Sequence, residues 1–260
     1  MATKTLIPES SEQQLMELQE AIGTADSVEL KLTVPVSDRS RSGEALGIDP
    51  IDGQIRQVYF FDTPDLALNA SGLVVRARRV QGRGDDSVVK LRPVVANELP
   101  SEVRLSPHFG VEVDTLPGGT FVCSGSMKHA MGPSEVKDAV AGRKPLRKVY
   151  SKEQRALYAA HAPEGIELDD LAILGPILVL KVKFVNQDSK RKFVAELWLY
   201  PDNSILVELS TKCAPNEAFQ VGVETRAFLT KRGIDLTGEQ ETKTKKALEF
   251  FSKRLTSTGS

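Results

Sequence analysis

The sequence predicts an α+β protein with a central antiparallel sheet and helices near both ends of the chain. Segments in which apolar and charged residues alternate with period two recur between residues 28 and 212, separated by turn-forming residues. Helical spacing of apolar residues dominates before residue 24 and after residue 215. Because no internal repeat or low-complexity linker divides the chain, we predict a single domain over residues 1–260, with its core at 27–212.

The first element is a short helix. Leu15, Leu18 and Ile22 have helical spacing, Ser10 and Ser11 can cap the start, and Gly23 can end the helix. Strand character then begins at Val28. The segments predicted as strands are 28–33, 57–62, 73–79, 87–92, 110–114, 146–159, 178–184, 192–200 and 205–212.

Residues 115–147 are rich in Gly, Ser and Pro, and we predict that they form an insertion with one helix. Pro133 suits the start of that helix and Gly142 its end. Two C-terminal helices are predicted within 215–254, broken at Gly233. Lys243, Lys245 and Lys246 would form a solvated face of the last helix or, alternatively, close one mouth of a barrel.

Composition excludes several classes of protein. The 260 residues hold 34 Lys and Arg against 35 Asp and Glu, which argues against a generic nucleic-acid binder. The N-terminal residues lack the apolar core of a signal peptide, and no apolar run is long enough to span a membrane. We therefore expect a cytoplasmic protein without membrane contact, in which Cys123 and Cys213 are free buried thiols.

Charged residues recur in pairs at i and i+2 on the predicted strands, so both members of a pair share one face. An antiparallel sheet with one wet face would also alternate in this way. However, the charged face holds mostly Arg, Lys, Glu and Asp instead of the usual mixture with Ser, Thr, Gln and Asn. If the sheet closes into a barrel, the interior must hold water or an anionic ligand, since dry burial of so many ions is costly. The pairs are Glu29 and Lys31, Arg76 and Arg78, Lys90 and Arg92, Glu112 and Asp114, Lys181 and Lys183, and Glu208 and Lys212.

Basic groups that converge from several strands suit a ligand with several phosphoryl groups, because Arg offers forked donors and Lys a compact charge. The same strand faces also carry a smaller number of Asp and Glu residues. Their presence beside a phosphate ligand is explained if the carboxylates hold Mg²⁺ or Mn²⁺, which bridges phosphate oxygens. Trp198 and Tyr200 alternate with leucines, and we predict that they belong to the barrel wall.

These motifs resemble the CYTH, or triphosphate tunnel metalloenzyme, superfamily, which includes class IV adenylate cyclases, thiamine triphosphatases and inorganic triphosphatases. VELK at 28–31 is similar to the second half of the E-x-E-x-K signature of that family. The match is strongest at YFFDTPDLALNASGLVVRARR, residues 59–79. It continues through VVKLRP at 88–93, VEVD at 111–114 and the segment from residue 195 to residue 212.

The resemblance implies an eight-stranded antiparallel β-barrel whose tunnel binds a triphosphate through basic side chains and a divalent metal through carboxylates. It implies that Lys31, Arg76, Arg78, Lys90 and Lys183 bind phosphate, and the strand pairs add Arg92, Lys181 and Lys212. The metal ligands would be Glu29, Glu112, Asp114 and Glu208. Glu29 and Lys31 are the predicted catalytic residues. The sequence departs from the family at Ser27, Gly110 and Ser210, which reduces the number of carboxylates and of basic groups.

The leading functional prediction is a metal-dependent phosphohydrolase that acts on inorganic triphosphate, thiamine triphosphate or a nucleoside triphosphate. One alternative is a class IV-type adenylate cyclase, which would release cyclic AMP and pyrophosphate. A third is a non-catalytic polyphosphate-binding module with a degenerate metal site. The expected partner is a small polyphosphate rather than a nucleic-acid polymer, bound by a monomer or homodimer.

Overall fold

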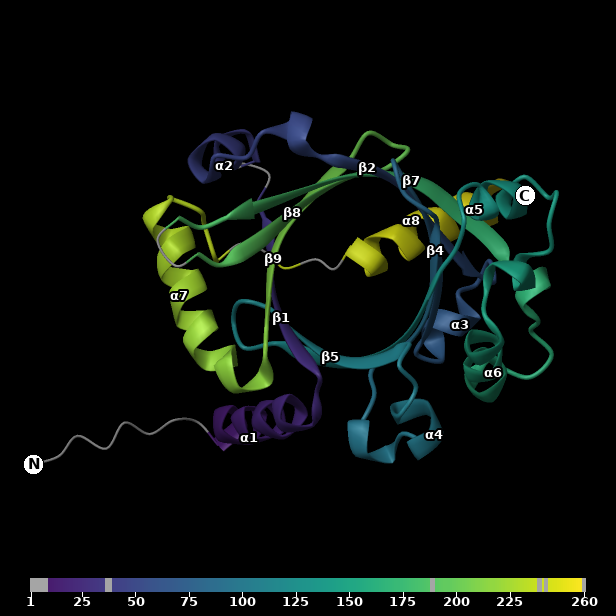
Figure 1. Cartoon of the computed structure of the whole chain (residues 1–260), viewed down its shortest axis with the longest axis horizontal. Coiled ribbons are helices and arrows are strands. Elements are labelled where there is room, and N and C mark those ends of the chain that lie inside the picture. Colours follow the sequence, from purple (N-terminus) through teal and green to yellow (C-terminus); the bar gives the residue numbers. More distant parts are fainter. Residues whose placement is uncertain (1–8, 36–38, 188–189, 238–239, 241–242, 259–260) are drawn as a thin grey trace, which may run out of the picture.

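A closed β-barrel forms the centre of the computed structural model, which describes residues 9–35, 39–187, 190–237, 240 and 243–258 (Figure 1). Around the barrel the strand order is β1-β5-β6-β4-β3-β2-β7-β8-β9, and β9 pairs with β1 to close the ring. The strands are β1 (Ser27–Val34), β2 (Gln54–Asp62), β3 (Leu73–Val80), β4 (Asp86–Leu91), β5 (Phe109–Thr115), β6 (Phe121–Ala130), β7 (Ala172–Val185), β8 (Lys192–Leu199) and β9 (Ile205–Cys213).

The barrel departs from the predicted eight antiparallel strands in two ways. It has nine strands, and β1 runs parallel to β5, with Glu29 opposite Asp114 in the register. The other neighbouring pairs are antiparallel. Parallel pairing requires a long connection, and the chain between β1 and β5 contains three other barrel strands.

Strand β6 lies within the segment that was predicted to be a helical insertion, so this prediction was wrong for residues 121–130. Gly125 and two serines give the segment the composition of a loop. Pairing with β4 and β5 overrides this local preference. A Cβ at Gly125 would lie 2.4 Å from Cζ of Phe109, so a larger residue there would require the Phe109 ring to move. The predicted insertion helix exists farther on, as α5 (Glu135–Val140).

The predicted strand at 146–159 was also wrong. Residues Leu146–Val149 form a short 3₁₀ helix, and α6 (Lys152–His161) follows. Ser151 and Gln154 form a reciprocal capping box at the start of α6, a spacing that the sequence already contained. The buried Gln154 amide also donates to the backbone carbonyls of Ser87 and Met127, so it joins α6 to β4 and β6.

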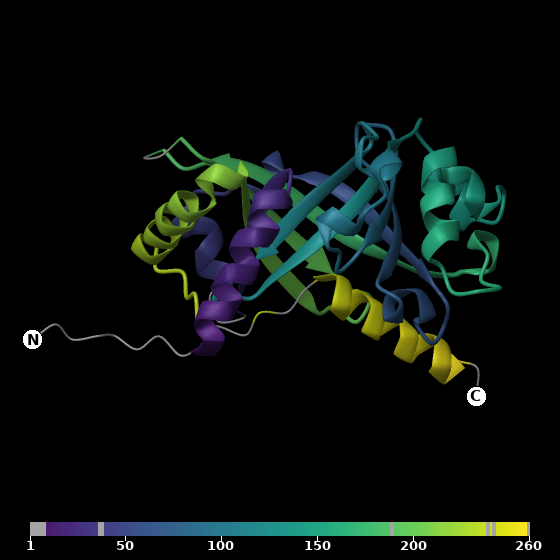
Figure 2. The same cartoon turned by 90° about the horizontal axis from the view of Figure 1, so that it is seen from below.

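The helices cover the outside of the barrel and one of its mouths (Figures 1 and 2). The remaining helices are α1 (Glu9–Thr24), α2 (Arg39–Leu46), α3 (Ala67–Ala70), α4 (Ser101–Arg104), α7 (Ala218–Lys231) and α8 (Lys243–Thr258). Helices α1, α7 and α8 confirm the predicted terminal helices; for α8 the predicted residues 238–239 and 241–242 lie outside the described residues. Short 3₁₀ helices occupy Pro50–Asp52, Ala96–Glu98, Leu168–Asp170 and Pro215–Glu217.

Helix α8 closes one end of the barrel. Ala247, Leu248 and Phe251 on one face of α8 are buried against inward-facing apolar residues of the strands, among them Val58 and Trp198. Fully burying a Leu or Phe side chain contributes about 1.5–3 kcal/mol, which holds the helix across this mouth.

Asp62, in the strongest of the quoted motifs, has a structural role. Its carboxylate accepts hydrogen bonds from the backbone N–H groups of Thr63, Leu68 and Asn69, at 2.8, 2.9 and 3.0 Å. These bonds organise the turn that leads to α3. Cys123 and Cys213 are free and buried, as predicted. Among the described residues, no helix has the length and apolar character that crossing a membrane requires.

Candidate functional site

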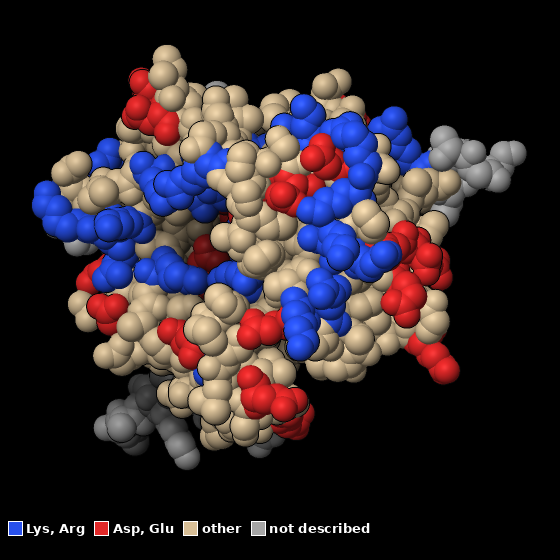
Figure 3. Space-filling view, turned by 45° about the vertical axis from the view of Figure 1, so that its right-hand side comes forward, with Lys and Arg blue, Asp and Glu red and all other residues tan. Residues whose placement is uncertain are grey.

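The barrel encloses a charged cavity of about 260 Å³. The period-two alternation turns the charged faces of the strands inward, as the sequence predicts. Among the described residues, ten basic and five acidic side chains line this cavity. The basic ones are Lys31, Arg56, Arg76, Arg78, Lys90, Arg92, Lys128, Lys181, Lys212 and Lys243, and the acidic ones are Glu29, Glu112, Asp114, Glu196 and Glu208. Figure 3 shows Lys and Arg side chains around a hollow on the surface, with acidic side chains deeper inside.

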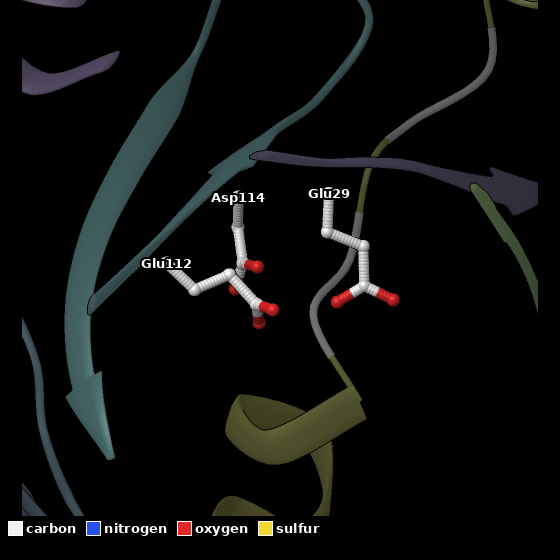
Figure 4. A group of neighbouring side chains, drawn as sticks. All are labelled: Glu29, Glu112 and Asp114. Atoms are coloured by element: carbon white, nitrogen blue, oxygen red, sulfur yellow. The ribbon is translucent and has the colours of Figure 1, made fainter. Parts of the chain in front are cut away.

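Three carboxylates form a cluster where β1 and β5 run side by side. Oxygens of Glu29, Glu112 and Asp114 all lie within 4.8 Å of one another (Figure 4). Glu29 is opposite Asp114 because β1 and β5 are parallel, and Glu112 is on the same face two residues earlier. The cluster therefore depends on the one strand pairing that the predicted antiparallel barrel did not contain.

Lysines surround these carboxylates. Lys31 Nζ lies 2.8 Å from Asp114 Oδ1 and 3.2 Å from Glu29 Oε2, and Lys212 forms an ion pair with Glu112. Burial opposes ionisation of Asp114, but the charges of Lys31 and Lys90 outweigh it and lower the pKa of this carboxyl to about 2. Burial likewise opposes ionisation of Glu29, and Lys31 and Lys243 lower its pKa. Both groups are thus anionic at neutral pH.

This cluster fits a hard divalent cation. Mg²⁺ and Mn²⁺ prefer carboxylate oxygens, and the ligands must be deprotonated to bind. Glu29 and Asp114 meet both conditions, Glu112 adds a third carboxylate, and the oxygens of the three are close enough together to share one ion. Glu208, the fourth predicted metal ligand, is not part of this cluster.

The opposite wall of the cavity is basic. Arg76 and Arg78 come from β3 and Arg56 from the neighbouring β2. Arg78 Nε donates to Asp86 Oδ1 at 2.8 Å, whereas the buried Nε of Arg76 has no hydrogen-bond partner among the described residues. Burial and the nearby charge of Arg78 lower the pKa of Arg76 to about 10. A buried donor without an acceptor is costly, and an anion would supply the missing acceptor.

Lys90 and Arg92 lie between the two walls. Lys90 Nζ is 3.8 Å and Arg92 Nη2 is 3.4 Å from Asp114 Oδ2. Burial lowers the pKa of Lys90 to about 8, although the charge of Asp114 partly opposes this change. Lys90 and Arg92 lie between the carboxylate cluster and the arginine wall. A ligand that extends from the cluster to the wall therefore passes both of these cations.

A second acidic pair lies on β8 and β9, where Glu196 and Glu208 stand directly opposite each other. Lys243, at the start of α8, places its Nζ 2.6 Å from Glu196 Oε2 and 2.7 Å from Glu208 Oε1. Lys181 lies 3.2 Å from Glu196 Oε1. Burial opposes the charge of Lys243, but the two glutamates outweigh it and raise its pKa. Their pairing with Lys243 neutralises carboxylates that would otherwise repel each other.

The structure brings most of the predicted site residues into one cavity. Only Lys183 among the predicted phosphate-binding residues is absent from the lining; it is exposed near the end of β7. Arg56, Lys128, Glu196 and Lys243 line the cavity but were not predicted to bind a ligand. The side chain of Lys243 is only 18% exposed and lines the lumen, so for this residue the solvated-face prediction was wrong; Lys245, at 71%, is exposed as that prediction expected. Lys243 precedes the apolar Ala247 by four residues, about one helical turn. This spacing could have predicted from the sequence that the two side chains share one face of the helix.

Trp198 lines the cavity from the wall, as predicted for a barrel residue. Its indole Nε1 donates to Glu196 Oε2 at 3.2 Å, and Lys243 Nζ lies 5.3 Å from the ring centroid. The ring is almost fully buried, so it supports the ion pairs at this end of the lumen.

No family sequence model and no curated protein sequence matches this chain. Solved structures do match. One is a candidate adenylyl cyclase from Hippeastrum with a dominant triphosphatase activity, at 16% identity and a TM-score of 0.59, covering 82% of this chain and 91% of that one. Another is a candidate adenylate cyclase from Bacillus halodurans, at 14% identity and a TM-score of 0.60, covering 85% of this chain and 98% of that one. At these identities the comparison concerns the fold.

Proposed function

The chain has the closed-barrel fold of these CYTH-type structures, and we propose that it is a divalent-metal-dependent phosphohydrolase acting on a triphosphate-containing substrate. The observation that carries the proposal is the content of one enclosed lumen. A cluster of three carboxylates faces a wall of arginines that includes a buried guanidinium without a partner. Such a lumen suits a ligand that is itself a chain of anionic groups bridged by a cation.

In this proposal Arg76 and Arg78 bind phosphoryl oxygens from one side, and Lys90 and Arg92 bind them beside the carboxylate cluster. Forked guanidinium donors fix the orientation of a phosphoryl group, and lysine ammonium groups neutralise charge that develops during transfer. Lys31, Lys181 and Lys212 line the same cavity and add positive charge along the path of the ligand. The enclosed position limits the access of bulk water to the reacting phosphoryl group.

Glu29, Glu112 and Asp114 would hold Mg²⁺ or Mn²⁺, with Glu29 as the catalytic carboxylate. When bound, the ion polarises phosphoryl oxygens and supports in-line attack by water. Lys31 holds Glu29 and Asp114 in place through its two ion pairs, and Ser210 donates a hydrogen bond to Glu29. In this structure Glu208 pairs with Lys243, so we assign it to support of the lumen rather than to the metal.

A substrate-by-metal screen with product identification tests the proposal. Purified protein is incubated with tripolyphosphate, thiamine triphosphate or ATP, each with Mg²⁺, with Mn²⁺ or with EDTA. Metal-dependent release of orthophosphate that is lost in Glu29→Gln supports hydrolysis. An absence of orthophosphate under every combination, with the fold verified by circular dichroism, would reject it.

Cyclisation of ATP is the second candidate, since the two solved structures described above are candidate cyclases. The same incubations separate the two reactions, because cyclisation yields cyclic AMP and pyrophosphate in place of orthophosphate.

A binding module without turnover is the third candidate. Ser27 and Ser210 stand where the family pattern has carboxylates, and the pairing of Glu208 with Lys243 removes one more carboxylate from the predicted metal ligands. Tight tripolyphosphate binding in EDTA without any product would favour this candidate.

A further inference from the structure

A second cavity, of about 530 Å³, lies outside the barrel between α7 and the outer faces of β1 and β9. Its lining includes Leu30 and Leu32 of β1, Phe193 of β8, Leu209 of β9 and Leu229 of α7. Strand alternation turns Leu30 and Leu32 outward, while Glu29 and Lys31 of the same strand face the charged lumen; the linings of the two cavities meet at Lys31 and Leu116. The outer cavity therefore differs in chemistry from the proposed triphosphate site.

Two residues of α7 shape this cavity, a glycine that leaves space beside it and a threonine whose hydroxyl is buried at its wall. Gly222 lies in the middle of the helix, where glycine costs about 1 kcal/mol relative to alanine. A Cβ added there would lie 3.6 Å from Leu30 Cδ2, an ordinary contact distance, so packing does not require glycine. One helical turn away, Thr225 lines the cavity, and its hydroxyl oxygen has no hydrogen-bond partner among the described residues.

The charges around the cavity indicate a neutral ligand. Lys31 contributes to the lining, but its ammonium group is directed into the lumen, 2.8 Å from Asp114. Arg226 also contributes, and it is exposed to solvent. Among the described residues that line the cavity, an anion would therefore find no buried positive partner. The volume is within the range of small-molecule sites, which are mostly apolar with a few placed polar groups.

We propose that this cavity binds a small neutral apolar or aromatic molecule with one hydrogen-bonding group. The apolar body packs between Leu30, Leu209 and Leu229, and the polar group pairs with the Thr225 hydroxyl after a rotation about χ1 between staggered positions. The site adjoins the triphosphate lumen at Lys31 and Leu116, and the proposal does not depend on the proposed phosphohydrolase activity.

Calorimetric titration of the full chain with 1-naphthol tests the proposal, because this probe joins an apolar ring system to one hydroxyl. We expect saturable binding of one molecule per chain. Gly222→Leu fills the cavity from the helix side and should weaken binding at least tenfold. Thr225→Val keeps the shape of the side chain but removes the hydroxyl, and should weaken binding about threefold to tenfold.

Val223→Leu is the matched control, since Val223 is 72% exposed on the same helix and does not line the cavity. Its affinity should equal that of the unmodified chain. Absence of saturable binding would overturn the proposal, as would equal binding by the unmodified chain and both cavity variants. If Gly222→Leu does not fold, the conservative Thr225→Val variant decides the outcome. Because the readout is binding of a probe without phosphate, its result is independent of the phosphohydrolase assay.

Discussion

Two groups of carboxylates share the lumen of this barrel, and their surroundings give them different chemistry. Glu29, Glu112 and Asp114 lie on β1 and β5, and their oxygens converge within 4.8 Å. Glu196 and Glu208 lie on β8 and β9, and a lysine from α8 stands between them. The first group can hold a metal ion, whereas the second already has an internal cation. The same residue type on the same inward face thus gives a candidate metal site in one place and a structural ion pair in the other.

Removing the internal cation should have the largest effect. Lys243→Met leaves Glu196 and Glu208 facing each other in a buried site, and removing one partner of such a network costs about 3–5 kcal/mol. Urea unfolding followed by circular dichroism measures this loss. Lys245→Met, at a 71% exposed side chain of the same helix, should change the free energy of unfolding by less than about 0.5 kcal/mol. Equal stability of the two variants would contradict the assigned role of Lys243.

Metal affinity separates the two acidic groups. Glu29→Gln should raise the dissociation constant for Mn²⁺ at least tenfold, or about 1.4 kcal/mol, because it removes a charged ligand from the cluster. Glu208→Gln is the matched control in the other group, and its affinity should stay within about threefold of the unmodified chain. Calorimetric titration of both variants provides the comparison. The distinction fails if Glu208→Gln weakens Mn²⁺ binding as much as Glu29→Gln does.

The arginine wall gives a test in which stability and binding move in opposite directions. Arg76→Met replaces a buried cation whose Nε lacks a partner, so the free chain should gain about 0.5–2 kcal/mol in stability. The same change should weaken tripolyphosphate binding at least tenfold. Thermal unfolding with and without tripolyphosphate measures both effects. Arg83→Met, on the exposed hairpin between β3 and β4, is the control and should alter neither quantity.

The pH dependence of stability should show the smallest change. Burial opposes ionisation of Glu196, but Lys243 and Lys181 outweigh it and hold its pKa well below the usual 4.5. A carboxylate with a lowered pKa in the folded state contributes stability above its unfolded pKa, and this contribution is lost as pH falls through the folded value. The stability difference between the unmodified chain and Glu196→Gln should therefore shrink below pH 4.5. Urea midpoints at pH 7 and pH 3 measure it, and a constant difference would contradict the pairing.

The predicted and observed folds agree where local patterns govern the backbone. The alternation in Glu29–Lys31, Arg76–Arg78 and Glu112–Asp114 identified inward faces correctly, because successive side chains of a strand point to opposite sides regardless of its neighbours. Strand β6 was not predicted, because its Gly and Ser residues have little preference for the strand conformation. It becomes a strand through its pairing with β4 and β5. Helix α6 was misassigned although its capping box was present in the sequence.

By itself, then, the sequence determined that the chain has charged strand faces, terminal helices and free cysteines, and which residues could meet in a lumen. Only the tertiary structure decided which of them do. Closure of the barrel through β1 put Glu29 beside Asp114, and the packing of α8 delivered Lys243 to Glu196 and Glu208. The physical reason is the distance along the sequence over which each effect acts. Local backbone geometry decides on which face of a strand a side chain lies. The charged groups that it meets there belong to strands and helices distant in the sequence.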